Sequence, residues 1–238
     1  RTVCRQNDLD VSDDQLELLE KFIRLLLEWN KKINLISRKD EENIWENHIL
    51  HSAAILFKLS FSKNLKWLDI GTGGGLPGIP LKILAPDISI TLLDSTQKKI
   101  HAVQEMITAL SLKDINAVWG RAEELGRQPE HSHQYDVVFA RSVAELKDLV
   151  KWSKLFLVER SAAKTRRHEE NNLSKAKMEV APPALVALKG GNLESEIQAA
   201  QRSYKSLSIR TINLTLQGSS QFEEGEKKIV VVEGGNLH

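Results

Sequence analysis

A glycine-dense segment, WLDIGTGGGLPGIP at residues 67–80, limits the folds open to this chain more than any other feature. Its first residues form an apolar run of strand type, and glycine fills five of the eight positions from 71 to 78. Glycine adopts the left-handed backbone conformations that tight turns need, and it lets a ligand approach the main chain closely. A glycine turn between a buried strand and a helix is typical of nucleotide-binding α/β folds, where free N–H groups at the helix start face the ligand.

Strand-length apolar runs alternate with helical stretches from residue 65 onward, which predicts a mainly parallel sheet covered by helices on both faces. The last two runs are joined by a short polar stretch that leaves no room for a crossover helix, so the last strand should be antiparallel. We therefore expect an α/β, Rossmann-like fold with a seven-stranded sheet. The seven runs are 65–70, 87–94, 115–120, 135–140, 184–190, 207–216 and 227–234.

The first sixty residues have a different, purely helical pattern. Apolar residues recur at helical spacing over 12–33 and again over 41–59, and Ser12 with Gln15 matches a capping box at the start of the first helix. We expect an N-terminal helical cap over 1–60 and a ligand-binding domain over 61–238, packed as a single compact unit. The polar stretch 159–183 should be an exposed excursion of that domain.

Composition narrows the class of protein. The chain has 238 residues, of which 41% are hydrophobic and 27% charged, as in ordinary globular proteins. No apolar run is long enough to span a membrane, the first residues lack a signal-peptide core, and the one cysteine, Cys4, fits a reducing compartment. We expect a cytoplasmic monomer without a membrane span. A net charge of +1 makes no case for nucleic acid by itself.

Spacing within the glycine segment separates three ligand classes. A P-loop needs Lys-Ser or Lys-Thr after its last glycine, where this chain has Ile-Pro, and a dinucleotide fingerprint needs a small residue in place of Leu76. The pattern Asp69-x-Gly71-x-Gly73-x-Gly75 resembles the S-adenosylmethionine loop of Rossmann-like methyltransferases. That ligand has an ammonium group, which Asp69 suits, and a carboxylate, which backbone N–H groups suit. A tight turn without a ligand is the alternative.

Polar residues at the ends of the following strands extend this site. Asp94 ends the second run, where an acid accepts hydrogen bonds from ribose hydroxyls. The alternative is a cap for the helix that begins at Thr96, and the two roles are compatible. The loop after the third run places Ala122 and Glu123 beside an adenine. Arg141 follows the fourth run and should reach the carboxyl edge of the sheet, where ligands bind in open α/β folds; a surface arginine is the alternative.

Metal and nucleic-acid signals are weaker. His48 and His51 lie three residues apart, but two imidazoles without a third ligand are more often packed or capping residues, so we expect no metal. Basic pairs could follow an RNA backbone, although each pair alone fits an ordinary solvated face. These pairs are Lys31-Lys32, Arg38-Lys39, Lys98-Lys99 and Arg166-Arg167.

Several motifs together resemble the RsmG (GidB) family, bacterial methyltransferases that modify N7 of a guanine in 16S ribosomal RNA. They are LLEWNKKINLIS, ENHILHS, GTGGGLPGIPLKI, TLLDS, GRAEEL, ARSVAEL and ALKGG, and the resemblance covers most of 12–232. It implies a class I methyltransferase fold, S-adenosylmethionine as cofactor, and 16S ribosomal RNA or the small ribosomal subunit as partner. The family often has an acid where this chain has His51, and its members usually have a shorter stretch than 159–183.

The resemblance also implies roles for individual residues. Cofactor-site positions of the family correspond to Gly71, Leu76, Ala122, Glu123 and Arg141. Arg121 and Lys189 are expected near the cofactor or the target base, which makes them, with Arg141, the candidate catalytic residues.

Methylation at N7 demands little chemistry. N7 of guanine has a free lone pair at neutral pH, so the protein must orient the base and exclude water and needs no general base. Two other functions would use the same cofactor or nucleoside residues. One is a methyltransferase for a small molecule, and the other is a non-catalytic nucleoside-binding module.

Overall fold

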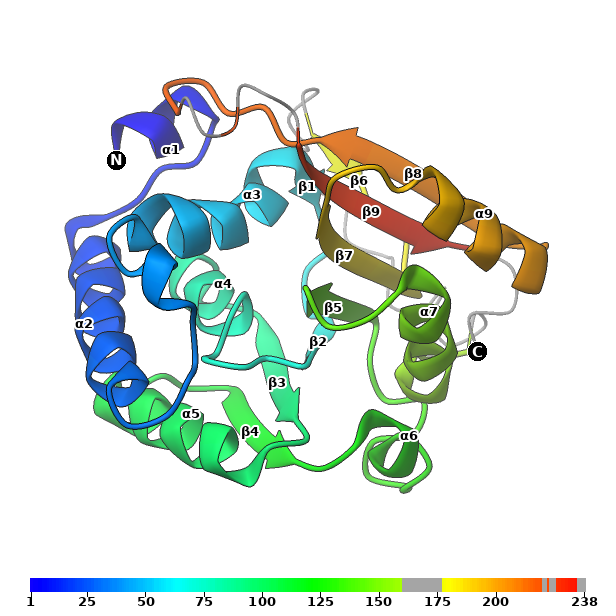
Figure 1. Ribbon diagram of the computed structural model, residues 1–238, viewed down its shortest axis with the longest axis horizontal. Helices are drawn as coiled ribbons and strands as arrows, with labels where there is room; N and C mark the ends of the chain where they lie inside the picture. Colours follow the sequence, from blue (N-terminus) through cyan, green and yellow to red (C-terminus); the bar gives the residue numbers. More distant parts are fainter. Residues whose placement is uncertain (160–176, 220–221, 223–225, 235–238) are drawn as a thin grey trace.

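A computed structural model describes residues 1–159, 177–219, 222 and 226–234 of the chain, and its centre is one seven-stranded sheet (Figure 1). The strand order is β4-β3-β2-β5-β7-β9-β8. Every pairing is parallel except those of β9, which is antiparallel to both β7 and β8. The predicted sheet and its antiparallel last strand are confirmed. The strands are β2 (Lys66–Ile70), β3 (Ser89–Asp94), β4 (Ile115–Trp119), β5 (Val137–Arg141), β7 (Ala184–Gly190), β8 (Ser208–Asn213) and β9 (Lys227–Glu233).

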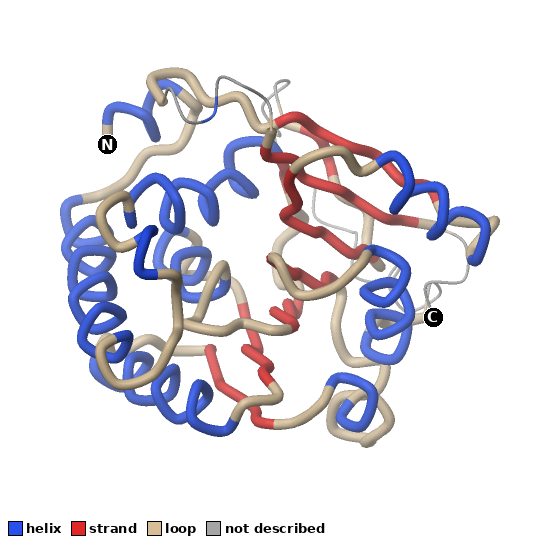
Figure 2. Tube along the Cα trace, viewed as in Figure 1, coloured by secondary structure: helices blue, strands red, loops and turns tan. Residues whose placement is uncertain are grey.

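Helices cover both faces of the sheet (Figure 2). Because side chains alternate along the strands, each layer of helices covers a separate core. On β2, for example, Trp67 points into one core and Leu68 into the other. The first core is covered by α2 (Asp13–Asn30), α3 (His51–Lys58), α4 (Gly78–Leu84) and α5 (Gln97–Ala109). The second is covered by α6 (Ala122–Leu125), α7 (Leu146–Phe156) and α9 (Glu194–Ser203).

The N-terminal helices pack directly on the sheet. A short α1 (Thr2–Gln6) precedes α2, whose capping box is formed as predicted: the Ser12 hydroxyl accepts from the Gln15 amide, and the Gln15 side chain accepts from the Ser12 amide. Phe22 and Leu26 of α2 are fully buried in the first core, together with strand residues. The cap therefore shares its hydrophobic core with the sheet.

The second N-terminal helix differs from the uniform one expected over 41–59. After a 3-10 turn, η1 (Arg38–Asp40), the chain forms a π-helix, η2 (Trp45–Leu50), before α3. A π-turn accommodates an extra residue per turn and is frequent at functional sites. Hydrophobic periodicity did not reveal it because both kinds of helix bury a similar stripe of residues.

The structure corrects one end of the expected excursion over 159–183. Residues 178 and 179 form β6 (Met178–Glu179), which pairs in parallel with β1 (Leu59–Ser60), and Val180, Pro182 and Pro183 are buried. This end is therefore partly packed, because a two-residue ladder joins it to β1 after α3, while Glu179 and Ala181 remain exposed. Residues 160–176, with the pair Arg166-Arg167, lie outside the described residues. In the described part of the chain, no helix is long and apolar enough to cross a membrane.

Candidate cofactor site

The glycine loop joins the carboxyl end of β2 to α4, at the edge of the sheet where a ligand is expected. Gly71, Gly73 and Gly75 have φ values of +71°, +57° and +84°, a region that other residues adopt only with strain. The Gly71 and Thr72 amides both donate to the Leu93 carbonyl of β3, at 2.7 and 2.9 Å. The loop is thereby folded back over the neighbouring strand.

Close packing fixes most of this loop and leaves two residues accessible. Between residues 71 and 80, Gly71 and Gly73 alone are not buried. A Cβ on Gly71 would lie 2.6 Å from Val143 Cγ2, so the glycine is needed there for space as well as for φ. At Gly73 a Cβ would lie 4.0 Å from the Gly71 and Leu35 carbonyl oxygens, an ordinary contact distance, and the residue is half-buried. A ligand can therefore reach the backbone of Gly73.

Asp69 supports the loop from inside the protein. Its side chain has no exposed surface, and its Oδ2 accepts hydrogen bonds from the Thr72 hydroxyl at 2.7 Å and the Gly78 amide at 3.1 Å. Its Oδ1 is buried and accepts no hydrogen bond from the described residues. Burial raises the pKa of this carboxyl to about 6, against the opposing effect of these two donors and Arg141. A buried carboxylate with an unpaired oxygen favours positive charge in a ligand nearby.

Asp94 contacts the start of α5, as one of its two alternatives suggested, and it also contacts the glycine loop, which was not predicted. Its Oδ2 accepts from the Gly73 amide at 3.0 Å, and its Oδ1 accepts from the Thr96 amide at 2.8 Å. Thr96 is the N-cap residue of α5, so Asp94 holds the helix start and the glycine loop at the same time. The side chain is 6% exposed at the carboxyl end of β3. It is thus adjacent to the accessible glycine.

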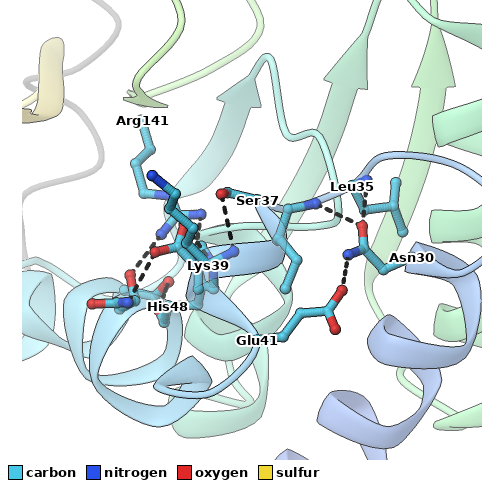
Figure 3. A network of polar contacts seen from close by, with 11 residues as sticks. Asn30, Leu35, Ser37, Lys39, Glu41, His48 and Arg141 are labelled. Carbon is cyan, nitrogen blue, oxygen red and sulfur yellow. Dashed lines mark hydrogen bonds and ion pairs between the residues drawn. The ribbon is translucent and has the colours of Figure 1, made fainter.

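Arg141 ends β5 and reaches across to the N-terminal cap (Figure 3). Its Nη1 donates to the Asn47 carbonyl at 3.3 Å, and its Nη2 lies 3.0 Å from His48 Nδ1. Burial lowers the pKa of this guanidinium to about 10, while the charges of Asp69 and Asp40 oppose that shift. With a pKa of about 10 the arginine remains a cation at neutral pH.

The loop after β4 supplies the two residues expected beside an adenine. Ala122 is buried and Glu123 is half-buried at the start of α6, while Arg121, the N-cap residue of that helix, is exposed. The Gly120 amide donates to the Asp94 carbonyl at 3.1 Å, which holds this loop beside β3. Asp94, Ala122 and Glu123 therefore lie at one edge of the sheet.

Two other predicted residues are engaged in structural contacts. Lys189 donates to the Ala144 carbonyl at 2.6 Å and forms an ion pair with Glu196 of α9. The Leu76 side chain is buried in the first core, and its amide donates to the Thr72 carbonyl at 2.8 Å. The structure does not bring Lys189 into hydrogen-bond contact with Arg141, Arg121 or the glycine loop.

Three residues of this site were not predicted from the sequence. Thr72 and the π-helical residues Asn47 and His48 hold Asp69 and Arg141, respectively. For Thr72 the available signal was a threonine between the motif glycines. For His48 there was no local signal, because it contacts Arg141 93 positions away along the chain. In the part of the chain that the structure describes, no group of three or more His, Cys, Asp or Glu side chains is arranged to hold a metal ion.

Comparisons with known proteins agree with this geometry. The model of the GidB family, described as rRNA small subunit methyltransferase G, matches residues 15–181. A Chlorobium limicola protein named ribosomal RNA small subunit methyltransferase G is 36% identical over 234 residues, which cover 97% of this chain and 94% of the relative. A Bacteroides thetaiotaomicron protein of the same name is 37% identical over 187 residues, with 79% and 80% covered.

A solved structure supports the fold. The crystal structure of a predicted O-methyltransferase from Agrobacterium tumefaciens superposes with a TM-score of 0.52 at 14% identity, covering 79% of this chain and 81% of that chain. At this identity the likeness shows the fold alone, and it confirms the expected class I methyltransferase architecture. Together with the match over residues 15–181, these relatives show that the chain belongs to the rRNA small subunit methyltransferase G (GidB) family.

Proposed function

We propose that this protein transfers a methyl group from S-adenosylmethionine to N7 of a guanine in 16S ribosomal RNA. The observation that carries the proposal is the accessible backbone of Gly71 and Gly73, held between the carboxylates of Asp69 and Asp94 in a member of this family. Such a loop accepts a ligand that has both an amino-acid end and a nucleoside end.

The residues present fit that cofactor. The half-buried main chain of Gly73 admits the ligand to the loop, and the charge of Asp69 beneath the loop favours an ammonium group above it. Gly75 and Leu76 shape the loop from the buried side. Asp94 offers its carboxylate to the ribose hydroxyls.

The remaining candidate residues surround the rest of the cofactor and the target base. We propose that Ala122 and Glu123 line the adenine position and that Arg141 contacts the cofactor. Arg121 is exposed at the same edge, where a cation suits the phosphates or the carbonyl edge of a guanine. Lys189 reaches the site only if its ion pair with Glu196 opens.

The chemistry follows from positioning. The bound cofactor supplies a methyl group on a sulfonium centre, and N7 of guanine supplies the attacking lone pair. The protein's part is to hold the base in line and to exclude water, which can contribute roughly 7–11 kcal/mol. No general base is required, since N7 carries no proton at neutral pH.

The substrate and setting are part of the same proposal. We propose that the partner is 16S ribosomal RNA or the small ribosomal subunit, met in the cytoplasm by a monomer that binds no metal. The helical cap over 1–60 and the methyltransferase domain over 61–238 act as one unit. Basic pairs on the cap, Lys31-Lys32 and Arg38-Lys39, suit an RNA backbone.

A methylation assay tests the proposal. The protein is incubated with methyl-labelled S-adenosylmethionine and small subunits, or their RNA, from cells that lack this modification. The label should appear at N7 of one guanine. Label on small molecules but not on RNA would favour a metabolite methyltransferase, and cofactor binding without any transfer would favour a nucleoside-binding module.

A further inference from the structure

The guanidinium of Arg141 is held by one short segment of the cap. Its two recorded hydrogen bonds both go to η2: Nη1 donates to the Asn47 carbonyl at 3.3 Å, and Nη2 lies 3.0 Å from His48 Nδ1 (Figure 3). A guanidinium has five N–H donors, so three remain without a hydrogen bond to the described residues. The contacts to η2 therefore fix the direction of the group without using all of its donors.

The protonation state of His48 follows from these contacts. A guanidinium only donates, so Nδ1 must accept and the proton of the neutral ring is on Nε2. Burial and the charge of Arg141 lower the pKa of His48 to about 4, against the opposing charge of Asp40. Nε2 lies 3.7 Å from Asp40 Oδ2. His48 is thus a neutral acceptor between a cation and a carboxylate.

The backbone of η2 makes this arrangement possible. His48 is buried, and its carbonyl accepts from the Ser52 hydroxyl at 2.7 Å, while the Asn47 side chain donates to Asp40 Oδ1 at 2.9 Å. Asn47 and His48, the two η2 residues that contact Arg141, are therefore each held by a further hydrogen bond. A buried imidazole that only filled space would not need an acceptor nitrogen directed at a guanidinium.

We propose that His48 is a positioning residue, which aims the guanidinium of Arg141 at the cofactor bound over the glycine loop. The inference rests on the proposed function, because it takes Arg141 as a cofactor contact. It assigns to the helical cap a part in building the cofactor site. The cap thus contributes more than a covering for the sheet.

Three substitutions of His48 separate positioning from packing. Asparagine can place its carbonyl oxygen near the position of Nδ1, glutamine places its carbonyl farther out, and leucine offers no acceptor. His48→Leu and His48→Gln should weaken binding of S-adenosylhomocysteine about tenfold, the lower end of what a lost hydrogen bond to a charged group costs. His48→Asn should stay within about threefold of the unsubstituted protein. KM for RNA should not change in any of them.

A control and a double variant complete the experiment. His131 is half-buried, makes one Nδ1 hydrogen bond, to Tyr135 at 2.9 Å, and precedes the opposite end of β5, so His131→Leu should leave cofactor affinity unchanged. In Arg141→Ala protein, adding His48→Leu should weaken the cofactor no further, since no guanidinium remains to be aimed. Ligand-free melting shows whether a variant is folded. If His48→Leu does not fold, His48→Gln takes its place in the comparison.

The affinity measurements test the positioning role of His48, and the methylation assay tests the proposed function. Unchanged cofactor affinity in both His48→Leu and His48→Gln, equal weakening by His48→Asn and His48→Leu, or additive effects with Arg141→Ala would overturn the positioning role. A protein that binds S-adenosylhomocysteine but methylates no RNA would refute the proposed function, while the affinity measurements would still test His48.

Discussion

Replacement of Asp94 by asparagine disturbs the point where the glycine loop and α5 meet. The carboxylate accepts from Gly73 at 3.0 Å and from Thr96 at 2.8 Å, and asparagine has a single acceptor oxygen. One of the two amides therefore loses a charge-assisted hydrogen bond, which is worth about 1.5–3 kcal/mol. At roughly 2–4 °C per kcal/mol for a chain of this size, Tm should fall by about 3–12 °C without ligand.

Cofactor binding should weaken as well, because the loop and the ribose contact both depend on this carboxylate. Complete loss of a contribution of 1.5–3 kcal/mol corresponds to about 10- to 150-fold in Kd, and asparagine should lie near the lower end. Differential scanning calorimetry and titration with S-adenosylhomocysteine measure the two effects. Asp87→Asn, an exposed carboxylate before the same strand, is the control. An unchanged ligand-free Tm in Asp94→Asn would refute the inference that Asp94 holds the glycine loop to the start of α5.

Four further substitutions probe the loop and its neighbours. In urea titrations, Gly71→Ala should lower the free energy of unfolding by about 2–5 kcal/mol and Gly73→Ala by only about 1–2 kcal/mol. Both residues have positive φ, but only a Cβ at Gly71 would lie 2.6 Å from Val143. Equal losses in the two variants would contradict this packing. The Asp69 carboxyl has a folded pKa of about 6 against an ordinary value of 3.8, so its protonated form stabilises the protein below pH 3.8 and that stability is lost as pH rises through 6. Asp69→Asn should therefore raise Tm above pH 6, with the difference vanishing below about pH 4, while cofactor binding weakens; a difference independent of pH would argue against the shift. Arg141→Ala should reduce methyl transfer at least tenfold with a smaller effect on folding, and a variant with full activity would remove Arg141 from the site.

The sheet and the glycine loop could be predicted because their signals are local. Alternating and continuous apolar runs mark strands, and Ser12 with Gln15 marks a helix start within four residues. The antiparallel pairing of β8 with β9 followed from a connection too short for a helix. Each of these features depends on neighbours in the sequence.

The parts that escaped prediction depend on contacts between distant residues. Arg141 was expected at the carboxyl edge, but its hold on His48 joins residues 93 positions apart. Lys189 was expected near the cofactor or the target base, and its ion pair with Glu196 could not be predicted because it joins β7 to α9. The π-helix at 45–50 escaped because its burial pattern resembles that of an α-helix. Asp94 was expected to bind ribose, to cap the helix, or to do both, and its contact with the distant Gly73 amide was not predicted.

Mapping of the methylated position tests whether the protein methylates N7 of a guanine in 16S RNA. Small subunits that lack the modification are incubated with the protein and methyl-labelled S-adenosylmethionine, and the 16S RNA is then digested and analysed by mass spectrometry. We expect one methyl group per RNA, at N7 of a single guanine, with transfer reduced at least tenfold by Arg141→Ala. Label at another atom or base, or RNA that stays unmethylated while the protein binds the cofactor, would contradict it.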